Sequence, residues 1–140
     1  MIYFFTYIIW IIYSSLFGIS DAYYWYSANV AKYSTRNFLF KDLHPNFFWT
    51  RSLVATVFAL LMSDDNYFIW LPIMICLGLT FPFFHNGFYY KTRNKIDPTQ
   101  YKLGFMDMSS TSIAKVNFTF FLRTISFLVG LSGLILIYFL

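Results

Sequence analysis

The sequence predicts an all-α integral membrane protein, a bundle of four transmembrane helices with both termini on the outer side. Hydrophobic residues make up 59% of the 140 residues and charged residues only 11%, whereas a soluble domain carries roughly 25% charged residues. Four apolar stretches alternate with polar segments, and the Lys and Arg residues gather on one side of that arrangement. A soluble core of this size could not bury so many apolar side chains, so lipid must cover much of the surface.

The sequence supports the first span more clearly than the second. Residues 2–20 contain no charge and match the roughly 20 apolar residues that a spanning helix needs. The aromatic residues that follow Asp21 suit the membrane interface, where the helix can continue. The second span is expected over residues 46–62, directly after Pro45, a residue favoured at helix starts. It is the weaker of the two because Arg51 interrupts it.

The last two spans are expected over residues 67–84 and 118–140. The third follows a short polar turn at residues 63–66 and is apolar throughout. The fourth follows a serine- and threonine-rich stretch at residues 109–112 that can cap a helix. We therefore expect the whole chain, residues 1–140, to form a single four-helix transmembrane domain.

The cations give this arrangement an orientation. Four spans place segments 21–45 and 85–117 on one side, and these segments hold every Lys and Arg except Arg51 and Arg123, which adjoin the same side. Cytoplasmic loops retain Lys and Arg, so we expect both segments in the cytoplasm. The eight cations of these segments include Lys102 and Lys115. The remaining six are expected to contact anionic lipid headgroups: Lys32, Arg36, Lys41, Lys91, Arg93 and Lys95.

Polar residues recur at the cytoplasmic ends of the four spans. They are Asp21, Arg51, the pair His85 and Asn86, and Arg123. An ionised side chain within lipid costs about 3 kcal/mol or more, so such residues usually face the bundle interior and find partners. We expect Asp21 to pair with Arg51 or Arg123. Two interpretations stay open: a site for an ion, proton or anionic headgroup, or a structural charge network that fixes helix register.

Metal, cofactor and catalytic sites have little support in the sequence. His44 and His85 lie on one side but lack the spacing of a metal or haem site. Cys76 is the single cysteine, and Asp64 with its neighbour provides too few ligands for a divalent cation. Glu and the usual catalytic motifs are absent. The sequence therefore predicts no enzyme, no cofactor and no metal.

Small residues mark the expected helix contacts. Close approach of membrane helices favours small side chains, and the expected packing positions are Ala55, Ala59, Ser126, Gly130 and Gly133. We expect these residues to join helices within one bundle first, and copies of a homo-oligomer second. The mixed aromatic and basic run at residues 89–95 is interpreted as a membrane-surface belt, not a nucleic-acid site.

One region resembles a known group. Residues 81–123 contain Phe-His-Asn-Gly-Phe-Tyr-Tyr, then Thr-Arg-Asn, Asp-Pro and Ser-Thr-Ser. This succession is similar to small multi-span membrane proteins, of no assigned activity, from bacteroidete bacteria and their phages. The resemblance implies a multi-pass protein of the bacterial inner membrane.

Three functions remain under consideration. The first is a non-enzymatic accessory or regulatory role, with membrane lipids and a membrane protein or second copy as partners, and no nucleic acid. The second is a small oligomeric transporter or channel with a polar site near Asp21, Arg51 and Arg123. Four-span multidrug exporters, which it resembles in outline, rely on a Glu in the first span, and this chain lacks it. The third is a phage-encoded lysis or exclusion factor.

Overall fold

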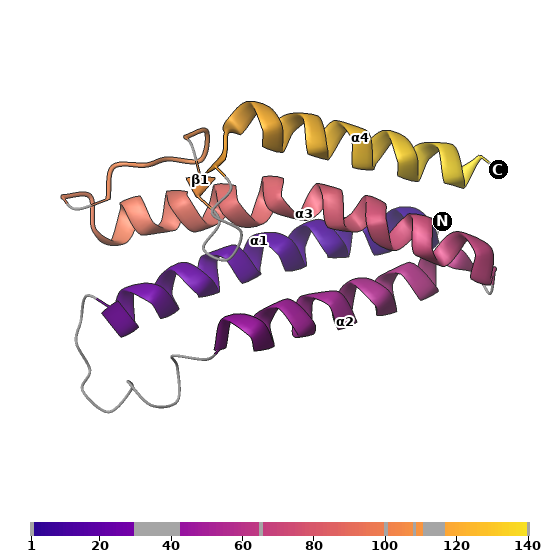
Figure 1. Ribbon diagram of the computed structural model, residues 1–140, viewed down its shortest axis with the longest axis horizontal. Helices are drawn as coiled ribbons and strands as arrows, with labels where there is room; N and C mark the ends of the chain where they lie inside the picture. Colours follow the sequence, from indigo (N-terminus) through magenta and orange to yellow (C-terminus); the bar gives the residue numbers. More distant parts are fainter. Residues whose placement is uncertain are drawn as a thin grey trace.

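The computed structural model describes residues 2–29, 43–64, 66–99, 101–107, 109–110 and 117–139, and it is almost entirely helical. Four helices run side by side along one direction (Figure 1). They are α1 (Ile2–Asn29), α2 (Leu43–Ser63), α3 (Tyr67–Ile96) and α4 (Phe120–Tyr138). Two short strands, β1 (Ser109–Ser110) and β2 (Asn117–Phe118), pair antiparallel before α4. The all-α class is confirmed, with this small ribbon added.

Three of the helices are long and apolar enough to cross a membrane. Their apolar portions are Tyr3–Ser27, Phe68–Ile96 and Phe120–Tyr138. Within the described side chains, α2 supplies a shorter apolar helix, Trp49–Ser63. Large apolar side chains are exposed on every helix, as expected where lipid is the solvent. The structure thus carries three candidate spans and one shorter apolar helix.

The helix α3 is the central element of the bundle. It packs most extensively against α1 and α4 and less extensively against α2. The helices α1 and α3 run in the same direction, α2 and α4 in the opposite one, and both chain ends lie at the same end of the bundle (Figure 1). The core lies around Trp10, whose indole N–H donates to the hydroxyl of Thr80 at 3.2 Å.

Small residues bring the helices together where the sequence predicted. Ala55 and Ala59 of α2 are buried in the core. The Ser126 hydroxyl of α4 donates to a backbone carbonyl of α3 at 2.8 Å. A Cβ added at Gly130 would lie 2.6 Å from the Cys76 carbonyl oxygen, and one at Gly133 would lie 2.6 Å from the Cys76 sulfur. The expected packing positions therefore lie at helix contacts inside one bundle.

Two helix boundaries differ from the expected limits of the polar segments. The polar segment expected from residue 85 is helical as far as Ile96, because aromatic and basic residues sustain a helix until Asp97, which precedes a proline and is disfavoured in helical conformation. The cap of the last helix is Thr119, whose hydroxyl accepts the Leu122 N–H at 3.2 Å, rather than a residue in 109–112. Residues 111–116 lie outside the described part of the chain.

Candidate functional site

Two helix faces with four-residue spacing meet along α1 and α3. Residues four apart share one face of a helix. The face on α1 carries Phe17, Asp21 and Trp25, and the face on α3 carries Phe81, His85, Tyr89 and Arg93. Ring contacts and polar bonds connect the two faces at successive turns. Asp21, His85, Tyr89 and Arg93 are therefore arranged as a ladder between two parallel helices.

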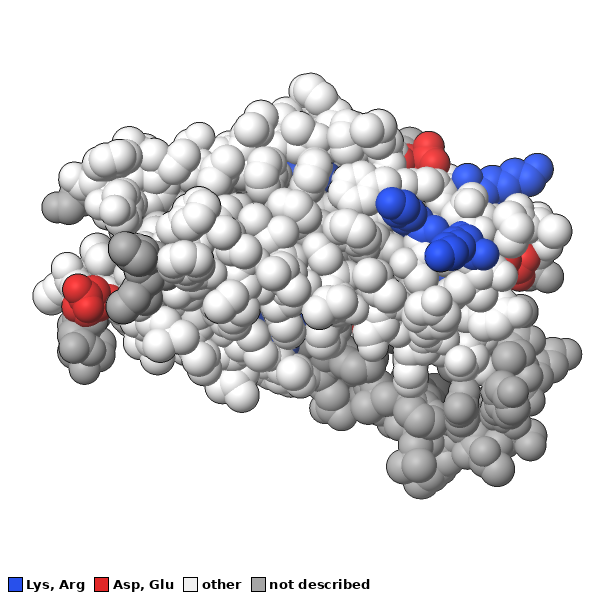
Figure 2. All heavy atoms as spheres, turned by 180° about the vertical axis from the view of Figure 1, so that it is seen from behind, with Lys and Arg blue, Asp and Glu red and all other residues white. Residues whose placement is uncertain are grey.

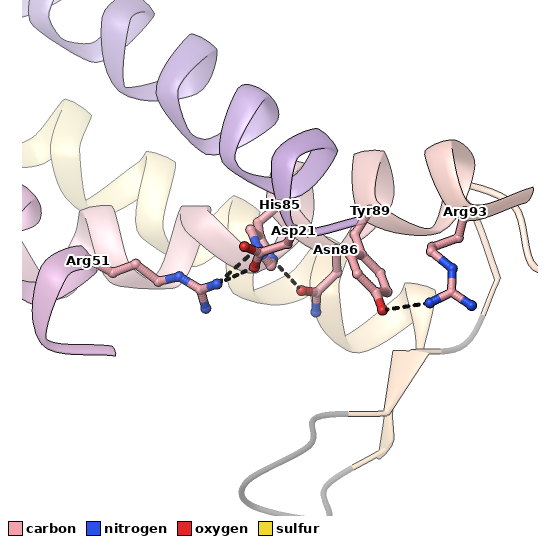
Figure 3. Close-up of polar contacts among 6 residues, drawn as sticks. All are labelled: Asp21, Arg51, His85, Asn86, Tyr89 and Arg93. Carbon is pink, nitrogen blue, oxygen red and sulfur yellow. Dashed lines mark hydrogen bonds and ion pairs between the residues drawn. The ribbon is translucent and has the colours of Figure 1, made fainter. Parts of the chain in front are cut away.

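The centre of the ladder is a three-helix contact between Asp21, Arg51 and His85 (Figure 3). Asp21 Oδ2 accepts a bond from Arg51 Nη2 at 2.5 Å and lies 3.0 Å from His85 Nε2. The Arg51 Nη2 and His85 Nε2 atoms are themselves 3.3 Å apart. One carboxylate oxygen of α1 thus connects α2 and α3. Of the two partners expected for Asp21, Arg51 is the one that contacts it.

Aromatic rings enclose this three-residue contact. The guanidinium carbon of Arg51 lies 4.8 Å from the Phe17 ring centre and 5.4 Å from that of Phe81. The His85 ring stacks on Phe81 at 4.8 Å. Rings placed in this way supply a favourable face to a cation, worth about 2 kcal/mol when desolvated. The side chains of Asp21 and Arg51 nevertheless stay 17% and 28% exposed, so the contact is not sealed inside the bundle.

Two further residues fix the position of His85. Its Nδ1 lies 2.9 Å from Asn86 Oδ1 on the same helix. A Cβ at Gly18 would lie 2.2 Å from the backbone oxygen of His85, so only glycine allows α1 to approach α3 this closely. This close approach is what brings Asp21, three residues further along α1, within reach of the imidazole.

Arg123 does not join this network, contrary to the sequence prediction. Its side chain is fully buried, and Nη2 donates to the backbone carbonyls of Phe105 and Asp107, both at 2.8 Å. A similar depth along the bundle does not bring Arg123 to Asp21, because α4 packs on a different side of α3 from α1 and α2. Arg123 instead anchors the segment 101–107 against α4.

Arg93 is also placed differently from the prediction that it contacts lipid headgroups. Only 4% of the residue is exposed. Its guanidinium carbon lies 3.4 Å from the Trp25 ring centre and 4.6 Å from that of Tyr101, and Nη1 donates to the Tyr89 hydroxyl at 3.4 Å. We call Trp25, Tyr89 and Tyr101 the aromatic cage. Aromatic rings suit this planar, weakly hydrated cation.

The Tyr101 phenol of the cage makes the stability of the protein depend on pH in the alkaline range. Burial, with Tyr90 stacked at 5.6 Å, raises the pKa of the Tyr101 phenol above its ordinary value of about 10. The folded chain holds this phenol neutral more firmly than the unfolded chain does. Its contribution to stability is therefore complete below pH about 10 and falls as the pH rises further. We expect Tyr101→Phe to lose less thermal stability than the wild type between about pH 9 and 11, and equal losses would contradict this.

Among the described residues, the exposed cations are lysines. In the described part of the chain, Lys91, Lys95 and Lys102 are exposed, and Figure 2 shows Lys and Arg side chains gathered at one end of the visible face. Lys32, Arg36 and Lys41, also predicted to contact headgroups, lie outside the described residues, as does the side chain of His44. Among the described residues, no group of three or more His, Cys, Asp or Glu could hold a metal ion.

Sequence reasoning missed the aromatic cage and the glycine contact. The four-residue spacing from Phe17 to Trp25 and from Phe81 to Arg93 was present in the sequence and could have identified both faces. The partners of Arg123 could not be found in this way, since they are backbone carbonyls of a loop.

Comparisons with known proteins add no relative. A scan against protein-family models, a search of curated proteins and a search of solved structures each returned no match. The resemblance of residues 81–123 to bacteroidete and phage membrane proteins stays a prediction.

Proposed function

We propose that this chain is a non-enzymatic, four-span protein of the bacterial inner membrane with an accessory or regulatory role, which contacts anionic lipid headgroups through its basic cytoplasmic end. The observation that carries the proposal is that the described arginines are bonded inside the fold, whereas the described lysines are exposed. The described arginines, Arg51, Arg93 and Arg123, are held by a carboxylate, rings and carbonyls inside the fold. The described lysines are all exposed at one end.

The exposed lysines have the geometry of a headgroup contact. Lys91 and Lys95 are one turn apart on α3, and Lys102 follows in the segment 101–107. The 30 residues of α3 extend about 45 Å at 1.5 Å per residue, longer than a hydrocarbon core of about 30 Å. With the start of α3 at the opposite surface, Lys91 and Lys95 reach the headgroup layer. Met106, 70% exposed, adds an apolar side chain suited to the interface.

The same arrangement supports our proposal of a fourth crossing and of the orientation. The parallel course of α1 and α3 requires the chain to return between them. The 21 residues of α2 extend about 31 Å, close to the thickness of the hydrocarbon core. This length supports α2 as the returning span. The exposed lysines then indicate a cytoplasmic surface at their end and outer-side termini.

The headgroup contact is tested by removing charge from the three lysines. We expect the combined variant Lys91→Gln, Lys95→Gln and Lys102→Gln to lose its preference for phosphatidylglycerol over phosphatidylcholine by roughly tenfold or more, since each lysine near the surface attracts anionic lipid. The measurement is the lipid retained by the whole protein in native mass spectrometry.

The matched control replaces the same three lysines with arginine, which keeps the charge and should keep the preference. Added salt should weaken it in the wild type. An unchanged phosphatidylglycerol preference in the glutamine variant would overturn the proposal. A terminal tag that is accessible from the cytoplasm would overturn the orientation on which it depends.

A further inference from the structure

The contact between Asp21, Arg51 and His85 is a triangle of three polar atoms rather than a simple ion pair. Its sides are 2.5 Å from Asp21 Oδ2 to Arg51 Nη2, 3.0 Å from Oδ2 to His85 Nε2, and 3.3 Å from Nη2 to Nε2. Nε2 therefore lies within reach of an acceptor on α1 and a donor on α2. Which of the two it bonds depends on whether Nε2 carries a proton.

The described arrangement suits a doubly protonated ring. Both ring nitrogens of His85 face oxygen acceptors, Asp21 Oδ2 at 3.0 Å and Asn86 Oδ1 at 2.9 Å. A neutral imidazole has one donor and one acceptor nitrogen, so it can satisfy only one of these oxygens. With Nδ1 donating to Asn86, a proton on Nε2 is required for the bond to Asp21.

Loss of that proton reverses the preference of Nε2. Its lone pair would face the Asp21 carboxylate, an unfavourable contact between two acceptors, while the Arg51 Nη2 donor is already 3.3 Å away. A small movement of Nε2 toward Nη2 then forms a normal hydrogen bond, whose N···N or N···O distance is about 3 Å. The neutral ring thus bonds α2 instead of α1.

We propose that Asp21, Arg51 and His85 form a proton-binding site in which protonation transfers the hydrogen bond of His85 from Arg51 on α2 to Asp21 on α1. The protonated state places two cations beside one carboxylate, so Arg51 is held less firmly. The neutral state ties α2 to both neighbouring helices. The ligand is a proton, and its effect is on the attachment of α2.

The neighbours of His85 allow this exchange. From α1 the ring faces the Asp21 carboxylate and the Phe17 ring. From α2 it faces Arg51, and on α3 it lies 6.5 Å from the Tyr89 ring, which bonds Arg93. The charged residue of α4, Arg123, is bonded to the segment 101–107 instead.

The test follows each ring nitrogen of His85 directly. The chain contains two histidines, so ¹⁵N-histidine labelling gives two imidazoles, and His44→Gln removes one of them. The whole protein is placed in phosphatidylcholine vesicles with ¹³C-labelled Asp and Arg, and solid-state NMR spectra are recorded across the range in which histidines titrate. Zwitterionic lipid separates this test from the headgroup proposal.

At the acidic end we expect both nitrogens of His85 to carry protons and Nε2 to couple to an Asp carboxyl carbon. At the alkaline end we expect Nε2 to be unprotonated and coupled to an Arg guanidinium carbon. Asp21→Asn, which keeps the side-chain shape, should abolish the carboxyl coupling at every pH and leave the Arg coupling at the alkaline end. The wild-type spectra suffice if a variant fails to fold. An Nε2 that keeps one partner throughout, or a proton lost from Nδ1 instead, would overturn the proposal.

Discussion

Replacing Gly18 with alanine should force α1 away from α3 and destabilise the protein more than a single methyl group usually does. The added Cβ would lie 2.2 Å from the His85 backbone oxygen, the shortest approach to a backbone atom among the glycines. Overpacking a core typically costs about 1–3 kcal/mol, and a backbone carbonyl within a helix cannot rotate aside as a side chain can. We therefore expect a loss near or above the upper end of that range. The measurement is thermal denaturation of the detergent-solubilised protein.

Gly78→Ala is the matched control for this substitution. Gly78 is also inside a helix, but no atom lies within 4 Å of its added Cβ. Alanine there should be neutral or stabilising by up to about 1 kcal/mol, through its higher helix propensity. If both variants denatured at the wild-type temperature, the close approach of α1 and α3 at Gly18 would be contradicted.

The sequence was sufficient to predict the apolar helices but not how far they extend. Hydropathy falls after residue 84, so the third span was expected to end there, whereas α3 continues to Ile96. Hydropathy reports which residues suit lipid, and helix formation depends on backbone propensity and the next breaking residue. The breaker here is the Asp97–Pro98 pair, which was visible in the sequence.

The sequence predicted how deep each candidate-site residue lies along its span. It did not predict the direction in which each side chain points around its helix. Asp21, Arg51 and His85 were expected near one level, and the structure brings these three together. Arg123 was assigned to the same level but faces the segment 101–107. Counting residues along a span gives its depth, whereas the direction of a side chain depends on which face the neighbouring helices bury. Close contacts such as Gly18 against His85 determine that face.

Arg123 itself supports a second prediction of large effect, because it connects a loop to the bundle. The segment 101–107 is closed on itself by the Asp107 carboxylate, which accepts the Gly104 N–H. Its Phe105 ring packs against Phe83 and Phe88. At its start the segment is held by Tyr101, which stacks on Tyr90 and contacts Arg93. At its far end it is held by the buried Arg123 guanidinium, which donates to two loop carbonyls at 2.8 Å. Removing this guanidinium leaves two carbonyl oxygens without their donor.

We expect Arg123→Met, which keeps the length of the side chain, to release segment 101–107 while the helices remain packed. Two hydrogen bonds from a charged donor are worth about 3 kcal/mol together at the low end, which corresponds to about a hundredfold larger population of the released loop. Trypsin cleavage after the exposed Lys102 should accelerate accordingly, since proteolysis follows the open population. Cleavage after Lys95, exposed on α3, is the internal control and should not change. Arg123→Lys should give an intermediate rate, because one ammonium lacks the fixed geometry of the guanidinium. Equal acceleration at both sites would show instead that Arg123 holds the whole bundle together. No acceleration at either would show that Phe105 and Tyr101 dock the loop without Arg123.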